Sequence, residues 1–180
     1  VEAADPLGAL GALGARRRRE RPAPVVAVTG STGKTTTKDL IAAAVGAGAY
    51  AAPSSYNNEI GVPLTVLACP DDAAALVVEV GSRGLGHITA LGEVIRPDIA
   101  VITNAGPAHL EMFGDVDTVR RAKWELVEAL SPQGVAVLPA ADPGLVAMCR
   151  GSMITFGEDP SADVAAGDVS VDARGRASFT

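Results

Sequence analysis

Short apolar runs and longer amphipathic stretches alternate along most of this chain. The apolar runs are rich in β-branched residues and have the length of buried strands; they lie at residues 25–29, 74–80, 99–103, 134–138 and 154–156. The stretches with helical spacing lie at 34–45, 62–69, 85–95, 117–130 and 142–149. Strands that alternate with helices predict βαβ units and a parallel sheet. We therefore predict an α/β fold, a doubly wound and mostly parallel sheet in a three-layer αβα arrangement.

Both ends of the chain depart from this pattern. Residues 1–24 contain a weak helical spacing of leucines and an arginine run at 16–19, and Pro22 and Pro24 precede the first strand. We predict that they form an interdomain linker with solvated arginines. Residues 25–157 are predicted to form the central domain, which is incomplete. Residues 158–180 alternate polar and apolar positions around a glycine turn, which predicts a truncated β-hairpin extension of that domain.

Charge and composition exclude several classes of partner. The formal net charge of −6 implies no general affinity for nucleic acid. No apolar run is long enough to span a bilayer, so we expect no membrane insertion and a cytoplasmic protein. Cys69 and Cys149 are far apart and match no metal spacing, which predicts two reduced thiols.

The most informative stretch is a glycine-bracketed turn directly after the first apolar run. It reads Gly30, Ser31, Thr32, Gly33, Lys34, Thr35, Thr36, and a helical stretch follows it. Two glycines let backbone N–H groups point at one anion, and the start of a helix adds partial positive charge. The lysine is placed to reach terminal phosphates and the Thr35 hydroxyl to ligate Mg²⁺. The strict eight-residue pattern has glycine where this chain has Val28, so the loop is a shortened phosphate-binding loop. A plain βα turn with a solvated lysine is the less favoured alternative.

Further polar residues follow the next predicted strands, at the edge of the sheet where ligands bind in doubly wound folds. Glu79 ends one apolar run, and a buried carboxylate needs a partner, either Mg²⁺ or a neighbouring arginine. Asn104 and His109 follow the next run. Lys123 lies on the following helix, where by itself it would be a surface lysine. His87 is interpreted as a structural histidine.

Four blocks of sequence, in the same order, resemble the Mur ligase family. The blocks are residues 29–37, 56–65, 102–114 and 122–125. The first, Thr-Gly-Ser-Thr-Gly-Lys-Thr-Thr-Thr, resembles the ATP loop of Mur ligases and folylpolyglutamate synthetases. The second, Tyr-Asn-Asn-Glu-Ile-Gly-Val-Pro-Leu-Thr, is similar to the substrate loop of the member that adds D-alanyl-D-alanine to a UDP-MurNAc-tripeptide. The last two resemble the metal loop and the carbamate helix of the same family.

The resemblance implies an ATP-dependent amide ligase of peptidoglycan precursor synthesis. In this family the substrate carboxylate forms an acyl phosphate, from which an incoming amine then displaces phosphate. By matching position, residues 30–36 and Asn104 would bind ATP, and Asn57 and Asn58 would face the UDP-MurNAc-tripeptide. Thr35, Glu79, His109 and a carbamylated Lys123 would hold two Mg²⁺ ions. The catalytic residues implied are Lys34, Lys123 and His109.

The sequence departs from the family pattern in three places. The strand tip reads Glu-Val-Gly rather than Glu-Met-Gly, and residues 139–142 read Pro-Ala-Ala-Asp. The adenine-binding segment and the flanking N- and C-terminal domains are not part of the sequence, so we expect this chain alone to turn over little or nothing. Two alternatives remain: another Mur-type ligase, of the MurT-like or folylpolyglutamate synthetase-like kind, or a P-loop nucleotide-binding module without ligase activity. The third residue of the tripeptide, diaminopimelate or lysine, is left open.

Overall fold

The computed structural model describes residues 3–21, 23–106 and 115–180 of the chain. The helices are α1 (Pro6–Arg19), α2 (Lys34–Val45), α3 (Gly61–Ala68), α4 (His87–Ile95), α6 (Val116–Glu128) and α7 (Pro143–Met148). The strands are β1 (Val25–Thr29), β2 (Ala49–Ala51), β3 (Ala75–Glu79), β4 (Ile99–Ile102), β5 (Val135–Pro139), β6 (Met153–Gly157), β7 (Val164–Ala165), β8 (Ser170–Val171) and β9 (Ala177–Ser178). None of the described helices is long and apolar enough to cross a membrane.

Seven strands form one sheet in the order β2-β3-β1-β4-β5-β6-β7. Every described pairing in this sheet is parallel. The predicted α/β fold with a doubly wound parallel sheet is therefore confirmed. Because β1 lies between β3 and β4, the segments that follow these three strands meet at one edge of the sheet.

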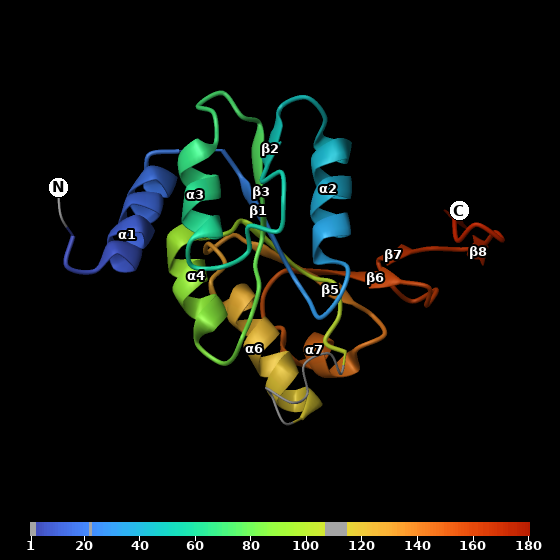
Figure 1. Cartoon of the computed structure of the whole chain (residues 1–180). Coiled ribbons are helices and arrows are strands. Elements are labelled where there is room, and N and C mark those ends of the chain that lie inside the picture. The colour runs from blue at the N-terminus through green and yellow to red at the C-terminus, as the bar shows by residue number, and fades with distance from the viewer. Residues whose placement is uncertain (1–2, 22, 107–114) are drawn as a thin grey trace.

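Helices cover both faces of the sheet, which gives the predicted three layers (Figure 1). Side chains alternate along β1: Val25 and Ala27 join the core beneath α3, α4 and α6, whereas Val26 and Val28 join the core beneath α2. A third cluster, centred on Leu138, packs β5 against α6 and α7. Burial on both faces explains why the strand sequences are continuously apolar rather than alternating.

Two strands of the sheet were not predicted. β2 pairs with β3 at one edge, and β7 pairs with β6 at the other. Each has three residues or fewer, too short for a hydrophobic pattern to indicate a strand. The hairpin predicted for residues 158–180 is confined to β8 and β9, which pair antiparallel around a turn at Gly175. In Figure 1 these last strands lie away from the helices, at the C-terminal end of the chain.

The first helix, α1, packs against α3 and α4. Gly14 is buried at this contact, where a Cβ would come within 3.0 Å of the Val94 side chain and 3.1 Å of Pro63. Glycine therefore allows close approach of the helices here, in addition to weakening α1. The assignment of residues 1–24 as an interdomain linker stays a prediction.

The expectation of solvated arginines before β1 is wrong for Arg18. Its side chain is 12% exposed; Nε donates to the Ile95 carbonyl at 2.8 Å, and Nη2 lies 2.9 Å from Asp98 Oδ2. The next basic residue after the run, Arg21, is 6% exposed and donates to the Cys69 sulfur at 2.9 Å and to the Pro70 carbonyl. These contacts join the segment before β1 to the body of the domain.

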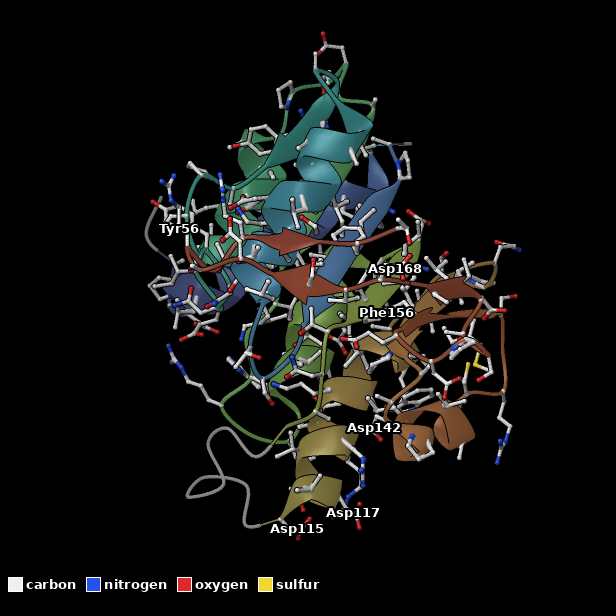
Figure 2. The ribbon with its side chains drawn as sticks, turned by 90° about the vertical axis from the view of Figure 1, so that its right-hand side faces the viewer. Tyr56, Asp115, Asp117, Asp142, Phe156 and Asp168 are labelled. Carbon is white, nitrogen blue, oxygen red and sulfur yellow. The ribbon has the colours of Figure 1, made fainter. Side chains whose placement is uncertain are left out.

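Charged side chains fix the position of α6, the helix that carries Lys123. Asp115 caps its N-terminus by accepting the Thr118 N–H at 2.6 Å. Arg120 donates from Nε to Asp142 at 2.9 Å, and Asp142 also caps α7 by accepting the Leu145 N–H. Figure 2 shows Asp115 at the start of α6 and Asp142 beside the same helix. Asp142, which belongs to the segment 139–142 where the sequence differs from the family pattern, therefore links α7 to α6.

Candidate functional site

The turn between β1 and α2 has the backbone geometry of an anion-binding loop. Gly30 has a φ of +154°, and a Cβ there would overlap the Thr103 hydroxyl. Gly33 has a φ of +80° and is the N-cap of α2. Within the described part of the chain, no side chain caps this helix start. Its first N–H groups and the positive end of its dipole thus face outward toward a potential anion.

The segment that follows β4 holds this loop in place. Asn104 accepts the Ser31 N–H with its carbonyl at 3.1 Å and the Thr32 N–H with Oδ1 at 3.2 Å. Its Nδ2 donates to the Thr32 hydroxyl at 3.0 Å, and Thr103 donates its hydroxyl to the Thr32 carbonyl at 2.6 Å. Asn104 was predicted to bind nucleotide; in the structure it contacts the loop directly. The part played by Thr103 was not predicted, because only the pairing of β1 with β4 reveals it.

Glu79 and Thr35 meet at the carboxyl end of β3. Glu79 is 2% exposed, and its Oε2 accepts the Thr35 hydroxyl at 2.7 Å. Its other oxygen accepts Nδ2 of Asn57 at 2.8 Å, and the Ser55 hydroxyl lies 3.2 Å from that of Thr35. Neutral donors, rather than an arginine, thus satisfy the carboxylate among the described hydrogen bonds. A hydroxyl and a carboxylate in contact beside an anion-binding loop are the oxygen ligands that Mg²⁺ prefers.

The lysine of the loop and the lysine of α6 share one cavity of about 210 Å³. Its described lining consists of Gly30, Lys34, Asn57, Asn58, Gly81, Ser82, Arg83, His87 and Lys123. Lys34 folds back onto the loop and donates to the Gly30 carbonyl at 2.8 Å. The structure thus brings together predicted site residues from three segments that are far apart in the sequence: Gly30 and Lys34, Asn57 and Asn58, and Lys123.

Lys123 is not a surface lysine. It is 4% exposed, and burial lowers its pKa from 10.5 to about 8. The positive charge of Lys34 contributes to this lowering of the pKa, whereas the charge of Glu125 opposes it. Such a pKa makes the amine partly neutral, and therefore nucleophilic, near neutral pH.

Glu125 is a further residue near the site that was not singled out from the sequence. It is 7% exposed and accepts the N–H groups of Gly86 at 2.6 Å and Thr89 at 2.9 Å. It thereby caps the N-terminus of α4 from a different helix, with a favourable charge. No local pattern indicates a cap between elements so far apart in the chain.

The two asparagines of the loop before α3 differ in their contacts. Asn57 binds Glu79 through its side chain and accepts the Gly81 N–H through its carbonyl at 2.7 Å. Asn58 caps α3, since its Oδ1 accepts the Gly61 N–H at 2.8 Å. Both also line the cavity, but their predicted role toward substrate stays a prediction. His109, predicted to bind a second Mg²⁺, lies outside the described residues.

His87 was interpreted as structural, yet it lies in the cavity wall. Its Nδ1 accepts the Arg83 N–H at 3.2 Å, and its Nε2 lies 3.3 Å from a carboxylate oxygen of Glu59. It begins α4, so its position follows from the helix that Glu125 caps.

Comparison with known proteins places this geometry in a family. Residues 28–180 match the family described as the Mur ligase middle domain. The chain is 40% identical over 156 residues to the UDP-N-acetylmuramoyl-tripeptide–D-alanyl-D-alanine ligase of Mycobacterium tuberculosis strain H37Rv. To the ligase of the same name from Bacillus subtilis strain 168 it is 37% identical over 143 residues. The matches cover 84% and 78% of this chain, and 31% of the length of each relative.

Solved structures give the same result. The fold superposes on the MurF ligase of Thermotoga maritima, solved in complex with ADP, with a TM-score of 0.88 and 28% identity, over 99% of this chain and 42% of that one. For MurF of Acinetobacter baumannii the TM-score is 0.86 and the identity 32%, over 100% of this chain and 43% of that one. The chain therefore belongs to the Mur ligase family, and its residues 28–180 match the family's middle domain.

Proposed function

We propose that this chain is the ATP-binding middle domain of a ligase that joins D-alanyl-D-alanine to UDP-MurNAc-tripeptide. The relatives from Mycobacterium tuberculosis and Bacillus subtilis carry this activity in their names, and the Thermotoga maritima neighbour was solved with ADP. The observation that carries the proposal is the cavity in which the lysine of an anion-binding loop and a buried second lysine lie together.

The residues fit a nucleotide with its metal. The loop leaves no room for a Cβ at Gly30, and the start of α2 offers N–H groups to phosphate oxygens. Thr35 and Glu79, whose oxygens lie 2.7 Å apart, would supply the oxygen pair for a first Mg²⁺. Lys123 as a carbamate, together with His109, would supply ligands for a second. When bound, the metal neutralises phosphate charge, which allows a carboxylate to approach.

The proposed reaction has two steps. The carboxylate of the tripeptide attacks the γ-phosphorus of ATP; the new O–P bond replaces the bond to ADP, which leaves. The amine of D-alanyl-D-alanine then attacks the acyl carbon and loses a proton, and inorganic phosphate leaves as the amide bond forms. Lys34 neutralises the oxygens of the γ-phosphate while the tripeptide carboxylate approaches it, and the cavity holds the carboxylate and the phosphate in position.

The chemistry of Lys123 supports its assignment as the carbamylated lysine. A carbamate forms only from a neutral amine, and the lowered pKa of Lys123 provides that form near neutral pH. The reaction converts a buried cation beside Lys34 into an anion, which turns a repulsive pair of charges into an attractive one.

The test measures phosphate release by the full-length protein that contains this chain. The assay contains ATP, Mg²⁺, UDP-MurNAc-tripeptide and D-alanyl-D-alanine, and compares wild type with Lys123→Ala, each with and without acetate. We expect release that depends on the dipeptide, falls in the variant and partly recovers with acetate, which replaces the lost carboxylate. Arg121→Ala, an exposed change on the same helix, is the matched control and should retain activity.

Two results would contradict the proposal. If release requires a different acid or amine, the nucleotide site stands but the substrate assignment fails. If release is the same with and without any acid or amine, the protein is a nucleotide hydrolase rather than a ligase.

A further inference from the structure

The wall of the cavity also carries a guanidinium group. Besides Lys34 and Lys123, the charged side chain in the described lining is Arg83, and this lining contains no carboxylate. Arg83 follows β3 by four positions and precedes α4, so the same sheet edge that places Glu79 also places this guanidinium. Its side chain is 64% exposed, which leaves it accessible to a ligand.

Arg83 contacts His87, which also lines the cavity, and Glu59, which does not. Its backbone N–H donates to Nδ1 of His87 at 3.2 Å, and Nε2 of the same ring lies 3.3 Å from Glu59 Oε2. Glu59 in turn lies 3.5 Å, through Oε1, from Nη1 of Arg83. The backbone N–H of Glu59 itself, and after it His87 and Arg83, hold the pKa of this carboxyl below its usual range. Glu59 is therefore an anion that directs Arg83 from outside the cavity lining.

This arrangement discriminates between ligand charges. An ammonium group at this wall would meet the guanidinium of Arg83, and the neighbouring carboxylate of Glu59 already faces Arg83 and His87. A carboxylate would meet a guanidinium, whose planar fork binds carboxylates through two parallel hydrogen bonds. If the ligand carries an ammonium group on the same carbon as that carboxylate, the negative charge of Glu59, beside Arg83, complements the ammonium. The pair Arg83 and Glu59 thus complements a zwitterionic amino-acid end better than a single ammonium.

We propose that Arg83 binds a second carboxylate of the acid substrate and so selects a tripeptide whose third residue ends in a carboxylate. Such a residue is 2,6-diaminopimelate; lysine, which ends in an ammonium alone, is disfavoured. The inference rests on the proposed function, because it concerns the peptide whose other carboxylate reacts near Lys34 and Lys123. Arg83 then acts as a specificity residue, with Glu59 and His87 as positioning residues.

The experiment uses the complete protein and two UDP-MurNAc-tripeptides, one ending in diaminopimelate and one in lysine. Initial rates of dipeptide-dependent phosphate release give kcat and KM for both peptides and for ATP. For wild type we expect a lower KM for the diaminopimelate peptide. Arg83→Gln should raise that KM roughly ten- to hundredfold, the loss expected for hydrogen bonds between charged groups. It should leave the KM for ATP and for the lysine peptide within about twofold, because neither is bound through this side chain.

Three further variants sharpen the result. Arg83→Lys keeps the charge but loses the fork, so it should recover only part of the discrimination. Glu59→Gln should weaken the preference for diaminopimelate less than Arg83→Gln does. Arg121→Gln, an exposed arginine of α6, should change none of the constants.

Different failures have different signatures. If wild type uses both peptides equally well, or if Arg83→Gln affects both peptides alike, the carboxylate-binding role is refuted while the ligase function stands. If Arg83→Gln instead raises the KM for ATP, the guanidinium binds nucleotide. If wild type releases no dipeptide-dependent phosphate with either peptide, the proposed function itself has failed.

Discussion

Lys123 should react with CO₂ near neutral pH, which an ordinary surface lysine does to a far smaller extent. Burial, and after it the charge of Lys34, lowers its pKa from 10.5 to about 8. At pH 7.5 this pKa leaves roughly a quarter of the amine neutral, whereas an ordinary lysine pKa leaves about 0.1% neutral. The reactive form is thus about two hundred times more abundant than at an unperturbed lysine.

The assay is ¹³C NMR of the protein in ¹³C-labelled bicarbonate. The lysines of this chain are Lys34, Lys38 and Lys123, so variants at these positions assign the carbamate resonances that the chain contributes. A resonance present in wild type should disappear in Lys123→Met and persist in Lys38→Met. The α-amino group, with a pKa of about 8, gives a separate signal that both variants keep.

The pH dependence provides a second check. At constant dissolved CO₂ the initial rate at which the Lys123 signal appears should rise with pH around a midpoint near 8, because deprotonation creates the reactive amine. Lys34→Met removes a cause of the lowered pKa, so the midpoint should move to higher pH while burial keeps it below 10.5. Identical spectra of wild type and Lys123→Met, or a midpoint near that of an ordinary lysine, would refute this reasoning.

Three other changes test the fold around the site. Gly30→Ala should abolish ADP binding in calorimetry, because the added Cβ would overlap the Thr103 hydroxyl; retained ADP binding would contradict this expectation. The Cβ of Gly33→Ala would meet no atom within 4 Å, so this variant should lose only roughly 1–2 kcal/mol of unfolding free energy through its positive φ. Glu125→Gln should lower the urea unfolding free energy by about 1–3 kcal/mol because it weakens the α4 cap. The exposed Glu128→Gln should change it by less than about 0.5 kcal/mol, and similar losses in the two variants would argue against the cap. Arg18→Met should lower it by about 2–3 kcal/mol, since it removes a largely buried ion pair and leaves the Ile95 carbonyl without this donor; an unchanged urea midpoint would disprove that contribution.

The parts of the fold that the sequence predicted are those with a strong local pattern. β1 and α2 were predicted with the bounds they have, because an apolar run, a glycine turn and a helical stretch follow one another directly. β3, β4, β5, β6 and the helices from α3 onward were predicted within a few residues. β2 and β7 escaped prediction because pairing with a neighbouring strand, rather than residue pattern, creates them.

The candidate site divides in the same way. The phosphate loop was evident from consecutive residues, and Glu79 from a carboxylate in an apolar strand. The roles of Thr103 and Glu125 could not be predicted, since each acts on a segment that is remote in the sequence. His87 was taken for a structural residue because a single histidine carries no information about the cavity it borders.

By itself the sequence determined the strand–loop–helix unit, the parallel α/β architecture and the set of polar residues at the strand ends. These features depend on backbone freedom at glycine and on hydrophobic periodicity, which are local properties. Only the tertiary structure decided that Lys123 is buried beside Lys34, that Arg18 is held by Ile95 and Asp98, and that Arg83 lines the cavity and forms an ion pair with Glu59. Burial and the distance between charges set their electrostatic behaviour, and both arise when strand order brings distant segments together.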